Sequence, residues 1–396
     1  LTMGHGCKKL ELPGQNGRFI KIFGTSNDDF PNSVVQTSDG GFLIAGTTGN
    51  YSYGLDSLDF LFVRTDQYGS PRWYQTFGGN GYDDIFDLVL VSEGDYLAVG
   101  TYDDDSSGRR KSVVMRLKET SDSLITDWIR YEDTLGLHSS KSALKASDGN
   151  YVVAGLVTDG ILLTKYSLGG DIVWRIPFLQ DDVSSISKLI ELSGGGYVLT
   201  GQAYNWSMNS NTATVWKFNV NGYKEKTYRS DVQNSEGISV VELADGKIAL
   251  LGNLIYSADT SQVFIQVLKP DLTDMSPKRY REFGGSGANY SRVPRLILEN
   301  DGSVTGGWHT NVGGAGSNDF SLSKIPIVTA EGSIGDRVWH RTYGGSNDDY
   351  MNNLIHTTDG GYVLVGFSYS FVAGGGNSAD IVLVRTDSEG KLDPED

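Results

Sequence analysis

Hydrophobic and polar positions follow two patterns along the chain, and the two patterns recur together. Runs such as 42–45 and 362–365 are apolar nearly throughout, as expected for strands that are covered on both faces. In 73–77 the side chains divide between two faces, as in a strand that is half exposed. Asp-Gly pairs, which tolerate the positive φ of tight turns, separate many of these runs. The pattern predicts a β protein made of short antiparallel strands.

One phrase defines the repeat. It reads Thr-Ser-Asp-Gly-Gly-Phe-Leu-Ile-Ala-Gly at 37–46 and Thr-Thr-Asp-Gly-Gly-Tyr-Val-Leu-Val-Gly at 357–366, with weaker copies between them. Seven glycines close the copies: Gly46, Gly100, Gly155, Gly201, Gly252, Gly306 and Gly366. Self-similarity at a period of roughly fifty residues indicates stacked supersecondary units. Each unit reads as four strands.

The two ends of the repeat region predict that the units close into a ring. Residues 18–24 match a fourth, outer strand without the preceding three, and 380–392 read as a third strand and its turn without a fourth. We therefore expect Phe19–Phe23 to pair with Ile381–Arg385. Since neighbours must cover both faces of every sheet, the sequence predicts an all-β fold, a seven-bladed β-propeller of four-stranded antiparallel blades.

Composition narrows the classes of function. The formal net charge is −16, so binding to the phosphate backbone of nucleic acids is unfavourable. No apolar run reaches the about eighteen residues that a membrane-spanning helix needs. The chain is expected to comprise one propeller at 18–392, a leader or tether at 1–17 and a tail at 393–396.

Two phrases resemble the repeats of known propellers. Residues 66–73, Asp-Gln-Tyr-Gly-Ser-Pro-Arg-Trp, resemble the aspartate–glycine–tryptophan docking motif of quinoprotein-type propellers. The longer phrase 339–361 resembles the WD40-like repeats of uncharacterised envelope propellers, many of them from Bacteroidota. The likeness implies a fold and not a reaction. The resemblance does not imply a quinone cofactor. The quinone-dependent dehydrogenases of this type are expected to be eight-bladed rings with an adjacent cysteine pair at the cofactor, whereas this chain has seven repeats and one cysteine.

That cysteine lies in a phrase of its own. Gly6-Cys7-Lys8-Lys9 is similar to the cleavage site and first residues of bacterial lipoproteins, including those of Bacteroidota. The resemblance implies a lipid anchor on Cys7, a tether at 8–17, and a location at the outer membrane, with the periplasmic or surface side left open. It further implies a subunit of a transport or secretion complex, such as the type IX system. An incidental cysteine in a leader is the alternative.

Acidic pairs occur at one place in the repeat, the loop from an outer strand to the next inner strand. The pairs are Asp28-Asp29, Asp83-Asp84, Asp181-Asp182 and Asp348-Asp349. In a propeller these loops gather on one face, where they would form an acidic rim for Ca²⁺ or a basic peptide segment. Alternatively, each aspartate accepts hydrogen bonds from its own turn. No loop spaces its oxygens like an EF-hand, so we expect no cofactor and leave Ca²⁺ as the alternative.

Aromatic insertions between second and third strands are expected on the same face. They supply Tyr51 and Tyr53, Trp206 in 204–209, Trp308 in 308–318, and Phe371 in 371–377. Aromatic loops on a rigid scaffold are typical of protein or sugar recognition, although long loops also occur without a role in binding.

No set of residues indicates catalysis. The histidines show no metal-ligand spacing, and there is no Gly-x-Ser-x-Gly elbow. We therefore expect a non-enzymatic binding or scaffold propeller of the bacterial envelope, with a protein partner on its loop face. The alternative is a glycan-binding module or glycan-cleaving enzyme. In that case, exposed aromatic rings should converge with paired carboxylates in one pocket.

Overall fold

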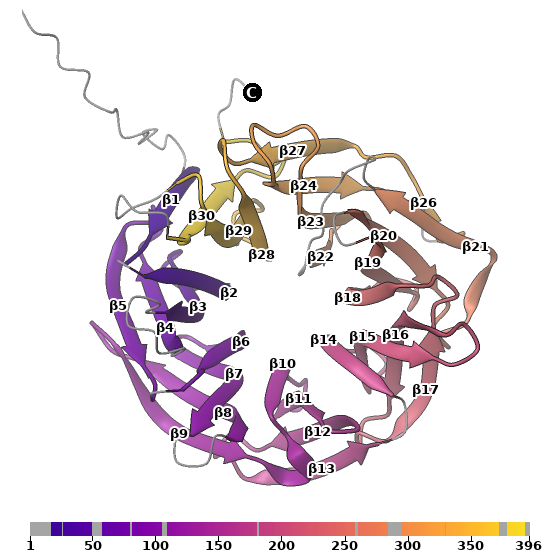
Figure 1. Ribbon diagram of the computed structural model, residues 1–396, viewed down its shortest axis with the longest axis horizontal. Coiled ribbons are helices and arrows are strands. Elements are labelled where there is room, and N and C mark those ends of the chain that lie inside the picture. Colours follow the sequence, from indigo (N-terminus) through magenta and orange to yellow (C-terminus); the bar gives the residue numbers. More distant parts are fainter. Residues whose placement is uncertain are drawn as a thin grey trace, which may run out of the picture.

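The computed structural model is a ring of seven four-stranded antiparallel sheets around a central channel (Figure 1). The chain is a seven-bladed β-propeller, as predicted. The structure describes residues 17–25, 27–49, 58–79, 81–104, 109–179, 182–257, 260–283, 295–328, 330–371 and 378–392. The predictions for Cys7, Tyr51, Tyr53 and Asp181 concern residues outside these ranges.

The first four blades run from the channel outward in chain order. Blade one is β2 (Asp28–Gln36), β3 (Phe42–Gly49), β4 (Leu58–Thr65) and β5 (Pro71–Phe77). Blade two is β6 (Asp84–Ser92), β7 (Asp95–Asp104), β8 (Arg109–Glu119) and β9 (Leu124–Glu132). Blade three is β10 (Ser139–Lys145), β11 (Tyr151–Val157), β12 (Gly160–Tyr166) and β13 (Ile172–Phe178). Blade four is β14 (Val183–Glu191), β15 (Tyr197–Asn205), β16 (Ser210–Phe218) and β17 (Lys224–Arg229).

The remaining blades follow the same plan. Blade five is β18 (Ser235–Glu242), β19 (Ile248–Ser257), β20 (Thr260–Leu268) and β21 (Asp274–Phe283). Blade six is β22 (Arg295–Leu298), β23 (Val304–Thr310), β24 (Asp319–Ile325) and β27 (Trp339–Tyr343), with a small hairpin of β25 (Ile327–Val328) and β26 (Ser333–Ile334) before its last strand. Blade seven is β28 (Asp349–His356), β29 (Tyr362–Ser368), β30 (Asp380–Thr386) and β1 (Phe19–Phe23). A 3₁₀ turn at Thr134–Gly136 precedes β10.

The ring closes at the predicted latch. Strand β1 pairs antiparallel with β30, and the register runs from Phe19 opposite Arg385 to Phe23 opposite Ile381. Both phenylalanines are buried, with 6% and 2% of their surface exposed. They pack in a cluster that also contains Phe42 of blade one. The first strand of the chain thus completes the last blade and contacts the first one (Figure 1).

Several neighbouring blades dock through an aromatic ring placed over a glycine turn, as the docking motif implies. Trp128 of blade two covers Gly170 of blade three, where an added Cβ would lie 2.6 Å from the indole. The Trp128 Nε1–H also donates to the carbonyl of Leu168 at 3.0 Å. At the latch, Phe19 covers Gly69 with the same 2.6 Å approach. A phenyl ring therefore replaces the indole where the ring closes.

A second repeated contact fixes the turn between the first two strands of a blade. A basic residue of the third strand forms an ion pair with the aspartate of that turn. The pairs are Arg64–Asp39 at 3.0 Å, Lys165–Asp148 at 2.6 Å, Lys324–Asp301 at 2.8 Å and Arg385–Asp359 at 2.8 Å. The aspartate in the turn between the first and second strands thus also ties that turn to the third strand of the blade.

The glycine that closes each copy of the repeat phrase is required for a steric reason. The inner strands shift register by a bulge, and the bulged strand brings a carbonyl oxygen against the second strand. A Cβ at Gly46 would lie 2.1 Å from the carbonyl oxygen of Phe30, and one at Gly100 would lie 1.9 Å from that of Asp84. No side chain fits such an approach, so the glycine permits the bulge.

Blade six departs from the predicted register. Trp308 pairs with Ser321 at the position that Gly46 holds in blade one, so the structural equivalent of the repeat glycine is Trp308 and not Gly306. Trp308 belongs to β23, has 3% of its surface exposed and packs in the core between blades five and six. Its prediction as a loop-face aromatic is therefore wrong, because the strand extends two residues beyond the predicted closing glycine.

Candidate functional site

Three of the predicted aspartates occupy one structural position, where they fix the loop before an inner strand. Asp29, Asp83 and Asp349 are buried, and each accepts a backbone N–H from four residues upstream. The donors are Thr25, Gly79 and Gly345, each at 2.7 Å. Burial raises the pKa of Asp29 and of Asp83. These carboxylates point into their own loops and do not form an exposed rim.

The other predicted aspartates have separate partners. The Asp28 carboxylate accepts the N–H of Ala379 at 2.7 Å, and that of Asp348 accepts the side-chain amide of Asn318 at 2.6 Å. Asp182 accepts the indole N–H of Trp206. Within the described residues, no three His, Cys, Asp or Glu side chains are grouped to hold a metal ion. The same residues contain no helix with the length and apolarity to cross a membrane.

Asp84 is not equivalent to the second aspartate of the other pairs. It begins β6, and its carboxylate accepts the side-chain amide of Asn32 at 2.7 Å. Burial raises the pKa of Asp84 to about 7, although the positive charges of Lys141 and Arg110 oppose the shift. Burial also lowers the pKa of Lys141, to about 8. Three blades therefore contribute to a buried cluster that titrates near neutral pH.

The substitution Asp84→Asn is expected to flatten the pH dependence of stability. Between pH 4 and 7 the folded protein keeps a proton on Asp84 that the unfolded chain has released, because the ordinary pKa of 3.8 is raised to about 7 on folding. The free energy of unfolding should therefore fall as the pH rises through this window, and level off above it. Asp84→Asn should remove the fall and exceed the stability of the wild type by about 2–4 kcal/mol at pH 8, because the raised pKa already includes the opposing charges of Lys141 and Arg110.

Urea denaturation from pH 4.5 to 8.5 measures this difference. Asp336→Asn is the control, because the Asp336 side chain is 92% exposed. The interpretation is wrong if Asp84→Asn and wild type lose stability in parallel as the pH rises.

Of the predicted aromatic residues, Trp206 is the one that the structure places at the surface, with 75% of its area exposed. The loop that carries it joins β15 to β16. The indole meets Tyr204 edge-on at 4.9 Å between ring centroids, and the Tyr204 hydroxyl donates to Asn209 at 2.6 Å. Phe371 is partly buried and packs against the core of blade seven. The two rings thus have different environments, although both lie in loops between second and third strands.

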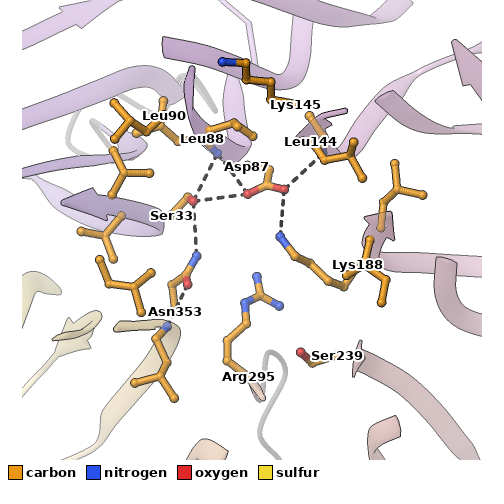
Figure 2. Close-up of a pocket in the computed structure, with 18 of the residues that line it drawn as sticks. Ser33, Asp87, Leu88, Leu90, Leu144, Lys145, Lys188, Ser239, Arg295 and Asn353 are labelled. Atoms are coloured by element: carbon orange, nitrogen blue, oxygen red, sulfur yellow. Dashed lines mark hydrogen bonds and ion pairs between the residues drawn. The ribbon is translucent and has the colours of Figure 1, made fainter. Parts of the chain in front are cut away.

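The channel contains a ring of side chains that the sequence analysis missed. In each inner strand that contains a bulge, the residue after the bulge borders the channel, and Arg295 holds the same position in β22. These residues are Ser33, Asp87, Ser142, Lys188, Ser239, Arg295 and Asn353. The cavity has a volume of about 560 Å³, and six of the seven line it. Figure 2 shows side chains from several blades converging on this space. The signal in the sequence was a polar or charged residue at one fixed position of every repeat.

Asp87 is the centre of the hydrogen bonds in this ring. It accepts from Ser142 Oγ at 3.0 Å and from Ser33 Oγ at 3.4 Å, and Lys188 Nζ lies 3.5 Å away. Asn353 Nδ2 donates in turn to Ser33 at 3.3 Å. Five blades are linked around the channel by these contacts, and Figure 2 shows those among Ser33, Asp87, Lys188 and Asn353. The ring therefore holds the inner strands at fixed distances and leaves polar groups facing the cavity.

Solved structures share this fold at low sequence identity. Chaetomium thermophilum Sqt1 matches with a TM-score of 0.52 and 10% identity, over 91% of this chain and 96% of that chain. Drosophila Plexin A, in complex with Semaphorin 1b, gives 0.51 and 10% over 92% and 86%. A Dyadobacter fermentans protein of unknown function gives 0.49 and 12% over 93% and 98%. No protein-family model matches the chain, and no curated protein matches it. At these identities the likeness shows the fold alone.

Proposed function

We propose that this protein is a non-enzymatic scaffold that binds a protein partner through its loop face, with Trp206 as the anchor. The observation that carries the proposal is the 75% exposure of Trp206 on a loop that is fixed from three sides. Asp182 accepts its indole N–H, Tyr204 packs against the ring, and Gln233 of blade five donates to the carbonyl of Met208 at 3.0 Å.

Such an anchor is suited to a protein interface. An exposed tryptophan offers a large apolar area, and truncation of such residues often accounts for much of the binding energy. Because the Trp206 loop is already held by its neighbours, binding costs little conformational entropy. The loops of blades four and five lie side by side, so a partner can extend across both blades.

The cavities support a protein partner over a glycan. A glycan site would combine exposed aromatic rings with carboxylates in one pocket. Neither Trp206 nor Phe371 lines the channel cavity, the cavity beside Glu299 and His356, or the cavity beside Asp39 and Glu119. Three of the predicted aspartates accept hydrogen bonds within their own loops. A broad surface with one strong anchor remains the better account.

The envelope setting rests on the sequence. The Cys7 phrase resembles the start of a bacterial lipoprotein, and the repeats resemble those of envelope propellers. We therefore propose a lipid-anchored subunit of an outer-membrane transport or secretion complex.

The test is recovery of partners with the full-length protein from detergent-solubilised bacterial envelopes. We expect the wild type to retain a partner that Trp206→Ala loses, since the truncation of such an anchor costs about 2–4 kcal/mol, or roughly 30-fold to 1,000-fold in affinity. Tyr68→Ala is the matched control, because Tyr68 is 56% exposed in a turn on the opposite face of the ring. Equal recovery by Trp206→Ala and wild type, or recovery of the protein alone, contradicts the proposal.

A further inference from the structure

We propose that the central channel binds a small organic carboxylate with an apolar body, held by Arg295 and Lys188. The site is distinct from the loop face around Trp206 and does not depend on a protein partner. Its elements are a cation free to accept a ligand, an excess of positive charge in the cavity, and an apolar wall beside that charge.

Arg295 supplies the free cation. It begins β22, lines the cavity and is half-buried. Its backbone pairs with Gly307 of β23, but its side chain forms no hydrogen bond or ion pair with any residue in the described part of the chain. Figure 2 shows its guanidinium pointing into the open space toward Lys188. A guanidinium has five donors in a planar fork that matches the two oxygens of a carboxylate, so its hydrogen bonds are available to a ligand.

The charges in the cavity do not balance. The polar ring contains one carboxylate, Asp87, and two cations, Lys188 and Arg295, and the rest of the cavity lining adds one group of each sign, Glu191 and Lys145. The Asp87 carboxylate already accepts from two backbone N–H groups, Leu88 at 3.1 Å and Ala143 at 3.2 Å, in addition to its serine partners. Burial lowers the pKa of Arg295, and the charge of Asp87 opposes this shift without an ion pair. One added negative charge would neutralise the ring.

The wall beside the cations is aliphatic. In five of the seven inner strands, the side chain two residues beyond the polar position is apolar, partly exposed and lines the cavity. The wall comprises Val35, Val89, Leu144, Ile190 and Ile355. A ligand on Arg295 would therefore bury an apolar body against this wall, at about 25 cal/mol for each Å² removed from water. The cavity volume of about 560 Å³ lies within the usual range for small-molecule sites.

The same arrangement favours a carboxylate over a phosphate. A monoanion neutralises the single excess charge of the ring, whereas a phosphate dianion would restore an imbalance of opposite sign next to Asp87.

Calorimetry on the full chain can separate the contributions of charge and apolar body. The four probes are octanoate, octanol, acetate and inorganic phosphate, at equal ionic strength. We expect octanoate to bind at least tenfold more tightly than each of the others, because it alone has both the carboxylate and the apolar chain. Octanol binding as tightly as octanoate would show that the cation does not contribute to the site, and acetate binding as tightly would show that the apolar wall does not. Phosphate as the strongest probe would overturn the ligand class.

Variants test the residue assignment. Arg295→Gln is expected to weaken octanoate binding at least tenfold, while Arg295→Lys, which keeps the charge and loses the fork, gives a smaller loss. Arg72→Gln is the matched control, since the Arg72 side chain is 48% exposed in the outer strand β5. Thermal unfolding of each variant establishes that it is folded. If Arg295→Gln does not fold, the binding measurement on Arg295→Lys tests the assignment instead. Octanoate affinity that is unchanged in both Arg295 variants, or no octanoate binding up to millimolar concentration, overturns the proposal.

Discussion

Removal of residues 1–24 is expected to abolish cooperative folding, whereas removal of residues 1–16 should leave the free energy of unfolding unchanged within about 0.5 kcal/mol. The longer truncation deletes β1, which forms the outer strand of blade seven. The shorter truncation ends before the first residue that the structure describes, Gly17, and so preserves every described contact of β1.

The size of the effect follows from the packing of the latch. Phe19 and Phe23 are buried in the cluster that joins blades seven and one. Loss of a buried phenylalanine side chain costs about 3–5 kcal/mol, so the two rings together rival the whole net stability of about 5–15 kcal/mol. The deletion also uncovers the edge of β30 and the glycine turn that Phe19 covers. Unpaired strand edges promote aggregation as well as unfolding.

Urea denaturation followed by circular dichroism distinguishes the two truncated proteins. The expected result is a sharp transition for the 1–16 deletion and a broad or absent one for the 1–24 deletion. If both proteins unfold with the same midpoint and the same slope, ring closure does not depend on β1 and the account of the latch is wrong.

The latch also shows what the sequence was able to predict. The last repeat lacks its fourth strand, and the chain begins with a strand that has no blade of its own. Because each blade face must be covered by a neighbour, the first strand is expected to complete the last blade and close the ring. The pairing of Phe19 with Arg385 and of Phe23 with Ile381 was therefore predicted to the residue. Blade docking was likewise readable, since the tryptophan and the glycine turn occupy fixed positions in the repeat.

Local register was harder to predict. Gly306 and Trp308 are two residues apart, and both fit a strand with alternating faces, so composition did not decide which one holds the position of the repeat glycine. Pairing with β24 decides it, and pairing is a property of the assembled blade. The acidic pairs show a related difficulty of register. Asp83, and not Asp84, is the counterpart of Asp29, so pairs that look alike in sequence differ by one residue in the structure.

The channel residues were not predicted because they converge from different blades. Asp87 and Arg295 lie far apart in the chain, and neither belongs to a motif. Their convergence depends on the closure of the ring and on the bulge that turns one residue of each inner strand toward the channel. Trp206 was identified as an aromatic in a long loop, but its support by Asp182 requires the fold. Sequence patterns thus predicted the scaffold, whereas the candidate sites depend on contacts between repeats.

The second large effect is expected from Gly100→Ala, which should destabilise the propeller by about 3 kcal/mol or more. An added Cβ would lie 1.9 Å from the carbonyl oxygen of Asp84 and 3.0 Å from the Cα of Ile85, so backbone atoms of β6 must move. Gly194→Ala is the matched control, because no atom lies within 4 Å of its added Cβ. It should change the free energy of unfolding by less than about 1 kcal/mol.

The comparison tests more than one steric contact. Gly100 faces the bulge between Ile85 and Asp87, and this bulge turns Asp87 toward the hydrogen bonds of the polar ring. If β6 lost this bulge, its residues after Ile85 would shift by one position relative to β7. A shift of one residue in a strand places each side chain on the opposite face of the sheet. Urea denaturation should therefore show a large loss for Gly100→Ala and almost none for Gly194→Ala. Equal stability of the two variants would mean that the bulge is not required, and that the repeat glycine has some other cause.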